Sequence, residues 1–351
     1  MSDTTTRTLP SADPEATETP GRTMKAIVRD RYGSADVLHL RDVEAPRVGD
    51  ETVLVRVRAA GLDRGAWHIM AGLPYLIRVA GFGLRGPKTA GLGTEFAGVV
   101  EAVGSKVAGL QAGEAVYGTC SASFAEYASV RPDQLSRMPA NLSFEQAAAV
   151  PVSAVTALQA LRGRGRVQSG QHVLIIGASG GVGTFAVQIA KTLGANVTGV
   201  ASTQKVDLVR SLGADHVIDY THADITDDSR RYDLVLDIGG NRPLSQLRRV
   251  LTDNGTLVIV GGEGGDRWTG GLHRQLGATV LSLLVRQRLG TLIAKSNSTD
   301  LDALRALIEA GSVTPSVDRV VGLEQVPKAI RDLADGRVRG KVVIAMTPWV
   351  R

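Results

Sequence analysis

The sequence predicts an α/β protein in which a barrel-like β domain is followed by a doubly wound parallel sheet. The first 120 residues contain short β-like segments separated by glycines. Beyond residue 170, six apolar segments alternate with mostly helical ones. A glycine-rich sequence at 177–183 follows the first of these segments and opens a helical stretch. The 351 residues are enough for two domains of ordinary size.

The β domain is predicted from alternation and glycine turns. Residues 51–59 alternate as a half-buried strand does, and shorter strands are expected at 25–28, 98–104 and 114–118. Near Phe144 the pattern changes, because 145–150 and 154–161 are alanine-rich and helical. These two helices are expected to lead into the second domain.

The parallel sheet is predicted from six strands with interleaved helices, at 172–177, 196–201, 216–219, 232–238, 256–261 and 278–284. The last of these overlaps the mostly apolar stretch 279–285, which has the length of a buried strand. After residue 298 the rhythm changes to a helix at 301–310, a strand at 316–321, a helix at 326–333 and a strand at 341–346. This final part is expected to return to the first domain.

The glycine turn predicts a phosphate site. Residues 172–176 are apolar, 177–183 read Gly-Ala-Ser-Gly-Gly-Val-Gly, and 185–191 are helical. Glycines let the backbone approach a pyrophosphate, and the N-terminus of the helix offers unpaired N–H groups to it. This order of strand, turn and helix favours a dinucleotide site.

The end of the second strand favours NADPH over NADH. An NAD site usually has an acidic residue there for the ribose hydroxyls, and 199–206 contain none. Ser202 and Lys205 occupy this region instead and suit a 2′-phosphate. The alternative is that Ser202 is only a helix cap and Lys205 only a solvated charge.

The composition narrows the function classes. The net charge of +5 is spread along the chain and aromatic residues make up 4%, so nucleic acid is not the expected partner. Cys120 is the single cysteine, which excludes an internal disulfide and a cysteine-cluster zinc site and fits a cytoplasmic location. The sequence contains no run of about 20 apolar residues, so no membrane span is expected. Residues 1–23 are polar and are expected to form a disordered tail.

Several further motifs occur in a characteristic order along the chain: 57–63, 97–104, 124–127, 151–161, 212–220 and 340–344. With these motifs and the glycine turn, the chain resembles the medium-chain dehydrogenase/reductase superfamily in its zinc-independent quinone oxidoreductase branch, and the resemblance extends over nearly all of 24–346. The resemblance implies a GroES-like β-barrel catalytic domain (24–150 and 298–351) and a Rossmann NADPH-binding domain (151–297), with the active site between them. It also implies a homodimer and hydride transfer from NADPH to a quinone or an α,β-unsaturated carbonyl.

The expected cofactor contacts follow from the resemblance and from the rule that ligands bind at the carboxyl ends of parallel strands. The residues are Thr156, Ser179, Gly180, Gly181, Val182, Ser202, Lys205, Tyr220, Gly239, Val260, Gly261, Gly262 and Lys341. For Lys341 the alternative is a surface lysine.

The resemblance also bears on metal binding. Zinc alcohol dehydrogenases of this superfamily have Cys where this chain has Asp63, His where it has Thr94, and Cys near Val152. The four-cysteine zinc lobe is missing as well, so no metal is expected. A substitute ligand set of Asp63, His68 and Glu95 is the disfavoured alternative.

Without a metal, a hydrogen-bond donor must stabilise the reduced oxygen. Our hypothesis is that Asp63 contacts the ribose or substrate and that His68 or Tyr75 donates to the substrate oxygen. Quinone oxidoreductases tend to have Asn and Tyr at the positions of Asp63 and His68, and His68 could instead be a packing residue.

The apolar stretch 71–90 is interpreted as a lobe over the substrate, or else as a dimer contact or ordinary packing. Three alternative functions stay open: a zinc-free alcohol dehydrogenase, an enoyl-thioester reductase, and a non-catalytic NADPH-binding protein.

Overall fold

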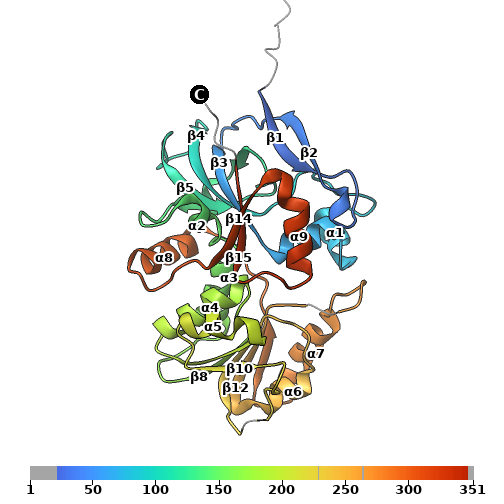
Figure 1. Cartoon of the computed structure of the whole chain (residues 1–351), viewed down its shortest axis with the longest axis vertical. Helices are drawn as coiled ribbons and strands as arrows, with labels where there is room; N and C mark the ends of the chain where they lie inside the picture. The colour runs from blue at the N-terminus through green and yellow to red at the C-terminus, as the bar shows by residue number, and fades with distance from the viewer. Residues whose placement is uncertain (1–21, 228, 263–264, 347–351) are drawn as a thin grey trace, which may run out of the picture.

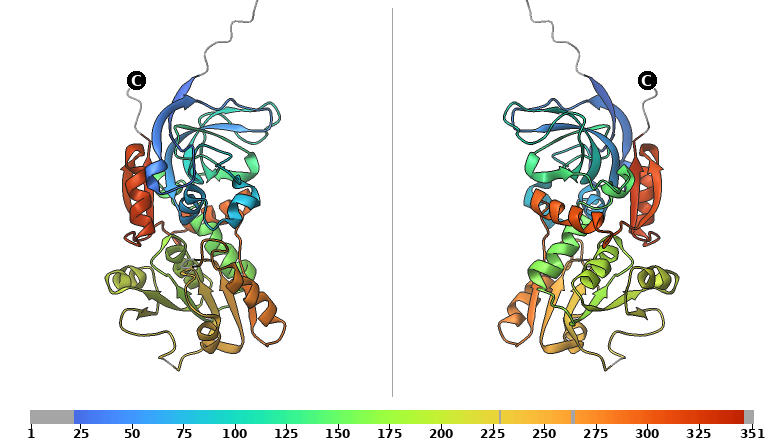
Figure 2. Two further views of the ribbon diagram at one scale, coloured as in Figure 1. Left: turned by 90° about the vertical axis from the view of Figure 1, so that its right-hand side faces the viewer. Right: turned by 90° about the vertical axis from the view of Figure 1, so that its left-hand side faces the viewer.

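The computed structural model describes residues 22–227, 229–262 and 265–346. The chain forms two lobes, with the parallel sheet in the lower one and the β-rich domain in the upper one (Figure 1). The red C-terminal elements belong to the upper lobe and lie beside the blue N-terminal strands (Figures 1 and 2). The fold class predicted from the sequence is therefore confirmed.

The lower lobe contains a six-stranded sheet of order β10-β9-β8-β11-β12-β13, with every pair parallel. This is the doubly wound order, in which the strand sequence reverses between β8 and β11. Its strands are β8 His172–Ile176, β9 Asn196–Ala201, β10 His216–Asp219, β11 Tyr232–Asp237, β12 Leu251–Ile259 and β13 Arg288–Thr291.

Helices cover both faces of this sheet, and buried aliphatic side chains pack on each side of it. They are α3 Ser153–Leu158 with its π-helical extension η4 Gln159–Arg164, α4 Gly181–Thr192, η5 Thr203–Lys205, α5 Val206–Ser211, α6 Leu244–Arg249 and α7 Leu272–Ser282. Helix α3 is buried along its whole length and lies at the junction of the lobes.

The upper lobe is built on a sheet of order β14-β15-β3-β4-β5-β7, with β6 paired to β3 and a separate β1-β2 ribbon. The strands are β1 Thr23–Val28, β2 His39–Glu44, β3 Val53–Leu62, β4 Glu95–Val103, β5 Ala115–Thr119, β6 Tyr127–Val130, β7 Leu135–Arg137, β14 Val317–Gly322 and β15 Lys341–Ala345. Since β15 pairs with β3, the chain returns to its first domain as predicted.

Shorter helices complete the upper lobe: η1 Ala35–Val37, α1 Arg64–Ala71, the π-helical turn η2 Arg78–Phe82, η3 Pro132–Gln134, α2 Phe144–Ala148, α8 Ser298–Glu309, η6 Leu323–Gln325 and α9 Val326–Ala334. The phenolic hydroxyl of Tyr117 in β5 donates to the carbonyl of Leu301 in α8 at 2.6 Å, which ties the returning chain to the barrel strands.

The strand predicted at 278–284 is wrong. Most of it is the end of helix α7, and the sixth strand lies later, at β13. Ala278, within α7, is buried, whereas Leu283 and Leu284, just after the helix, are 84% and 78% exposed. The segment 279–285, with five apolar residues out of seven, carries no period that separates strand from helix, so the sequence pattern was ambiguous here.

The predicted tail falls mostly outside the described residues, because the structure is described from Arg22 onward. Arg22 donates to Glu101, and Thr23 already begins β1, so these two residues belong to the folded domain. Among the described residues, no helix combines the length and apolar character that a membrane crossing requires.

Candidate functional site

A cavity of about 840 Å³ lies between the lobes, at the carboxyl ends of the central parallel strands. Ligands of doubly wound sheets bind at this edge, near the point where the strand order reverses. Twelve of the residues predicted from the sequence line it: Asp63, Thr156, Ser179, Gly180, Gly181, Val182, Ser202, Lys205, Tyr220, Gly239, Val260 and Lys341.

The glycine turn forms the floor of the cavity. Gly177 follows β8 with a φ of 86°, and Gly180 caps α4 in an extended conformation. A Cβ on Gly183 would lie 2.1 Å from the carbonyl oxygen of Gly177, so only glycine permits this close turn. The first N–H groups of α4 have no acceptor within the helix and point toward the cavity end, which suits a pyrophosphate.

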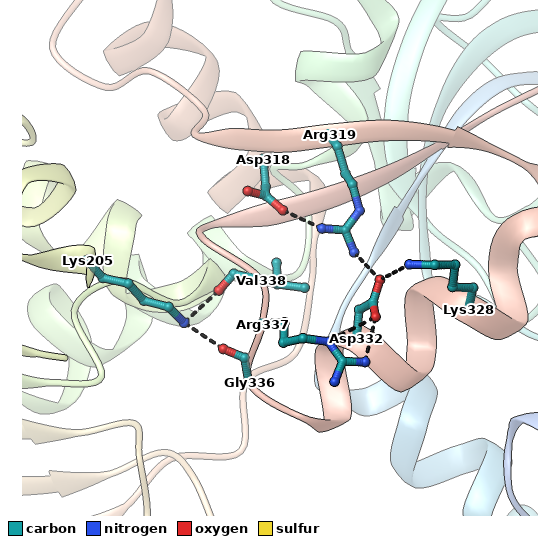
Figure 3. A network of polar contacts seen from close by, with 8 residues as sticks. All are labelled: Lys205, Asp318, Arg319, Lys328, Asp332, Gly336, Arg337 and Val338. Carbon is teal, nitrogen blue, oxygen red and sulfur yellow. Dashed lines mark hydrogen bonds and ion pairs between the residues drawn. The ribbon is translucent and has the colours of Figure 1, made fainter. Parts of the chain in front are cut away.

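At the end of β9, Ser202, Lys205 and Tyr220 lie along one side of the cavity. The ammonium of Lys205 donates to the carbonyl oxygens of Gly336 and Val338, each at 2.8 Å, and so spans from one lobe to the other (Figure 3). Partial burial lowers the pKa of Lys205, with a smaller contribution from the charge of Arg339. The alternative of a merely solvated Lys205 is therefore wrong.

The sequence reading missed a second group of cavity residues, Asp224, Asn241, Arg242, Pro243 and Gln246. Arg242 donates to Asp224 at 2.5 Å. Burial opposes ionisation of Asp224, but hydrogen bonds from Arg242 and Thr226 outweigh it and lower the pKa to about 2. The position of 241–243 directly after β11 could have revealed them, whereas Asp224 lies in a loop without a motif.

Gly261 and Gly262, two of the cofactor contacts expected from the sequence, are not among the residues that line the cavity. Within the segment 260–262 that follows β12, Val260 is the residue that lines the cavity. The reason is an ion pair in which Arg274 of α7 donates to the fully buried Asp237 at 2.6 Å and to the Gly261 carbonyl at 3.2 Å. These contacts hold the segment after β12 against the helix.

Asp63 and Thr156 lie at the end of the cavity nearest the β-rich lobe. Asp63 caps α1 by accepting from the N–H of Ala66 at 2.9 Å, and it also accepts a hydrogen bond from the hydroxyl of Thr94. The hydroxyl of Thr156 donates to the Val152 carbonyl at 2.7 Å. These side chains are fixed by the fold before any ligand binds.

Lys341 is a buried residue, so the alternative of a surface lysine is wrong. Its side chain is 1% exposed and pairs with the carboxylate of Glu95, which is fully buried. The second oxygen of Glu95 accepts from the Val152 N–H at 2.8 Å. Burial raises the pKa of Glu95, the charge of Lys341 opposes that rise, and the charge of Asp63 adds to it. A Cβ on Gly181 would lie 2.9 Å from the Lys341 side chain, so the pair also supports the glycine turn.

The structure does not bring His68 or Tyr75 to the cavity. Nδ1 of His68 lies 2.8 Å from the Leu73 carbonyl, beyond the end of α1, and its ring stacks edge-on against Trp67. Tyr75 packs edge-on against Trp268, and its N–H donates to the Arg267 carbonyl. The stretch 71–90 thus contacts the parallel-sheet lobe, and this neighbourhood keeps both side chains away from the cavity.

The substitute metal set is not assembled either. Asp63, His68 and Glu95 have the separate partners described above, and the described residues contain no group of three His, Cys, Asp or Glu side chains placed to hold a metal ion.

Two family models match the sequence. Residues 49–159 match the one described as "Alcohol dehydrogenase GroES-like domain", and 212–344 match the one described as "Zinc-binding dehydrogenase". The chain is 32% identical to a 2-methylene-furan-3-one reductase of Solanum lycopersicum, over 93% of this chain and 80% of that protein. It is 30% identical to a quinone oxidoreductase of Sus scrofa, over 92% of this chain and 98% of that protein.

The quinone oxidoreductase of Coxiella burnetii is a solved structure with the same architecture. It superposes with a TM-score of 0.83 at 28% identity, over 93% of this chain and 100% of that one. The matches in sequence and in structure both extend over the two lobes. The chain belongs to the medium-chain dehydrogenase/reductase superfamily.

Proposed function

We propose that this protein is an NADPH-dependent oxidoreductase that transfers hydride to a quinone or an α,β-unsaturated carbonyl without zinc. The observation that carries the proposal is the glycine turn opening into a cavity of about 840 Å³ between the lobes. The relatives support the acceptor class, because their names include a quinone oxidoreductase and, in Arabidopsis thaliana, an NADPH-dependent alkenal/one oxidoreductase at 32% identity.

A dinucleotide fits the residues present. Only glycine at 183 leaves room for the turn, and α4 offers its N-terminus to a pyrophosphate. Ser202, Lys205 and Tyr220 would hold the 2′-phosphate, and the absence of an acidic residue at 199–206 favours NADPH. Gly239 and Val260 would line the path toward the nicotinamide, with Lys341 beneath it.

The bound cofactor would supply the hydride, and the protein would hold the cofactor and the acceptor in position. Thr156 and Asp63 lie at the cavity end nearest the β-rich lobe, where the acceptor would be held. Asp63 accepts two hydrogen bonds and thus acts as a structural acceptor rather than a proton donor. Since His68 and Tyr75 lie outside the cavity, water is the proposed source of the proton for the reduced oxygen.

The test is oxidation of NADPH, with NADH in parallel, against ortho-quinones, para-quinones and enones in the presence of a chelator. Turnover with NADPH that survives the chelator supports the proposal, and the preferred acceptor separates quinone from enone reduction. Lys205→Met serves as the matched variant, with an expected loss of the preference for NADPH. Tight NADPH binding without turnover of any acceptor would contradict the reductase and favour a binding role.

We also propose the domain division 24–150 with 298–351 and 151–297, a homodimer, and a cytoplasmic location. The exposed apolar side chains Leu276, Val280, Leu283, Leu284 and Ile293 support the homodimer, because they gather around α7 and the edge strand β13. The cytoplasmic location stays a prediction, since the similar proteins include a chloroplastic one of Arabidopsis thaliana and a mitochondrial one of Danio rerio.

A further inference from the structure

The segment 335–340 joins α9 to β15 and lies along the rim of the cavity; we call it the strap. Gly336, Val338 and Gly340 of the strap line the cavity. Two contacts attach it to the parallel-sheet lobe: Lys205 holds the carbonyls of Gly336 and Val338, and the N–H of Gly340 donates to the Ser179 carbonyl at 2.9 Å. The strap therefore contacts the two places where the ribose phosphate and the pyrophosphate of a dinucleotide would lie.

Asp332, in the last turn of α9, anchors the strap from the other side (Figure 3). One oxygen of its carboxylate, Oδ1, accepts two hydrogen bonds from Arg337, at 3.1 and 2.7 Å. It also pairs with Lys328 at 2.8 Å and Arg319 at 2.7 Å. The Asp332 side chain is 9% exposed, and hydrogen bonds from Lys328 and Arg337 lower its pKa to about 2.

The position of Arg337 in the chain links this anchor to Lys205. Arg337 lies between Gly336 and Val338, whose carbonyls accept from Lys205. Fixing the Arg337 side chain on Asp332 therefore restrains the backbone on both sides, and with it both carbonyl oxygens. Two N–H groups of one guanidinium that converge on one carboxylate oxygen restrict the position of the arginine side chain more than a single hydrogen bond does.

Two fixed acceptors define the direction of the Lys205 ammonium. A lysine ammonium carries three N–H groups on a flexible four-carbon stem. Among the residues that the structure describes, the strap carbonyls are its hydrogen-bond acceptors, and Lys205 also lines the cavity. Two of the three N–H groups are used by the strap, which leaves the third for an acceptor bound in the cavity.

We propose that Asp332 is a positioning residue for cofactor selectivity: through Arg337 and the strap, it holds the ammonium of Lys205 toward the 2′-phosphate of NADPH. The inference rests on the proposed function, because it assumes that Lys205 binds this phosphate. According to this proposal, the β-rich lobe preorganises the phosphate site. It does so through the Asp332 carboxylate, which does not itself line the cavity.

Electrostatics alone predicts the opposite effect of removing Asp332. Neutralising this carboxylate leaves Arg319, Lys328 and Arg337 without their shared counter-charge, so the region becomes more positive. More positive charge would favour any phosphate-bearing ligand. Weaker NADPH binding in an Asp332 variant would therefore report lost positioning rather than lost charge.

The test compares Asp332→Asn and Arg337→Gln with Lys328→Gln, a control that removes another partner of the same carboxylate. Dissociation constants are measured by calorimetry for NADPH, NADH, adenosine 2′,5′-bisphosphate and adenosine 5′-monophosphate. We expect both test variants to weaken the two 2′-phosphorylated ligands about three- to tenfold, the scale of ordering one flexible side chain. NADH and adenosine 5′-monophosphate should change less than about twofold, and Lys328→Gln should behave as the wild type.

Lys205→Met separates this inference from the proposed function. If Lys205→Met does not reduce discrimination between NADPH and NADH, the proposed phosphate site fails. If it does, Asp332→Asn should have no further effect in the Lys205→Met background. Equal weakening of NADPH and NADH, unchanged binding, or tighter NADPH binding in Asp332→Asn would each overturn the positioning role. Melting curves check that every variant is folded. If Asp332→Asn does not fold, the binding measurements on Arg337→Gln decide the positioning role.

Discussion

Replacing Lys341 by methionine should destabilise the protein strongly, because the change strands a buried charge. Glu95 is fully buried and would keep only the Val152 N–H as the hydrogen-bond partner described for its carboxylate. Removing one partner of a buried ion pair typically costs about 3–5 kcal/mol. For a lobe of this size, such a loss should lower the melting temperature by on the order of 10 °C. Methionine fills the volume of the lysine stem, so lost packing adds little.

The loss of stability caused by Lys341→Met should increase with pH. The pKa of Glu95 is already raised by burial, and the charge of Lys341 counteracts that rise. Without Lys341, the pKa of Glu95 in the folded state rises further above its value in the unfolded chain. The variant therefore keeps its free energy of unfolding at low pH and loses it as the pH rises through the folded-state pKa of Glu95. The deficit against wild type should therefore be larger at pH 8 than at pH 5.5.

Thermal melts at the two pH values measure this, with Lys341→Met/Glu95→Gln as the control. The double variant removes the stranded charge and should recover more than half of the deficit at pH 8. The reasoning is refuted if Lys341→Met melts within about 2 °C of wild type at pH 8, or if the double variant melts no higher than the single one.

Three further changes have defined outcomes. Gly183→Ala would place a Cβ 2.1 Å from the Gly177 carbonyl oxygen. We expect the affinity for NADPH, measured by calorimetry, to fall at least tenfold. The control Gly163→Ala has open space around its Cβ and should leave the affinity unchanged. Asp63→Ala removes the cap of α1 and should cost about 1 kcal/mol in denaturant unfolding, whereas Asp63→Asn, an equally good cap, should cost less than half of that. Leu283→Glu/Leu284→Glu should shift a dimer toward monomer in light scattering at unchanged melting temperature; a dimer that survives would place the interface elsewhere.

The sequence predicted the parallel sheet well because its strands are buried on both faces. The strands predicted at 172–177 and 232–238 are largely apolar and bounded by turn residues, and they appear as β8 and β11, each within one residue. The edge of the sheet was predicted poorly, because β13 has only four residues and little apolar character. The more apolar run before it belongs to a helix whose outer face is exposed.

The candidate site was predicted where local chemistry defines it. Gly177–Gly183 and Lys205 follow strands whose carboxyl ends meet by topology, so spacing alone placed them at one edge. His68 and Tyr75 were selected for their chemical type, and the fold turns both toward other partners. Side-chain direction on α1 and in 71–90 depends on contacts with Trp67 and Trp268, which no local pattern encodes.

The cavity is a joint product of the two lobes, and this decides which residues can control it. The parallel sheet supplies the glycine turn and the residues after β9 and β11, which recognise features common to dinucleotides. The β-rich lobe supplies Asp63, Lys341 and the strap, and less than a third of the residues that line the cavity come from its segments 62–65 and 333–341. Lys205 spans the boundary through backbone carbonyls, which persist when the strap side chains change. Cofactor selectivity can therefore be altered through residues such as Asp332 that contact neither ligand nor cavity, while the glycine turn stays constant.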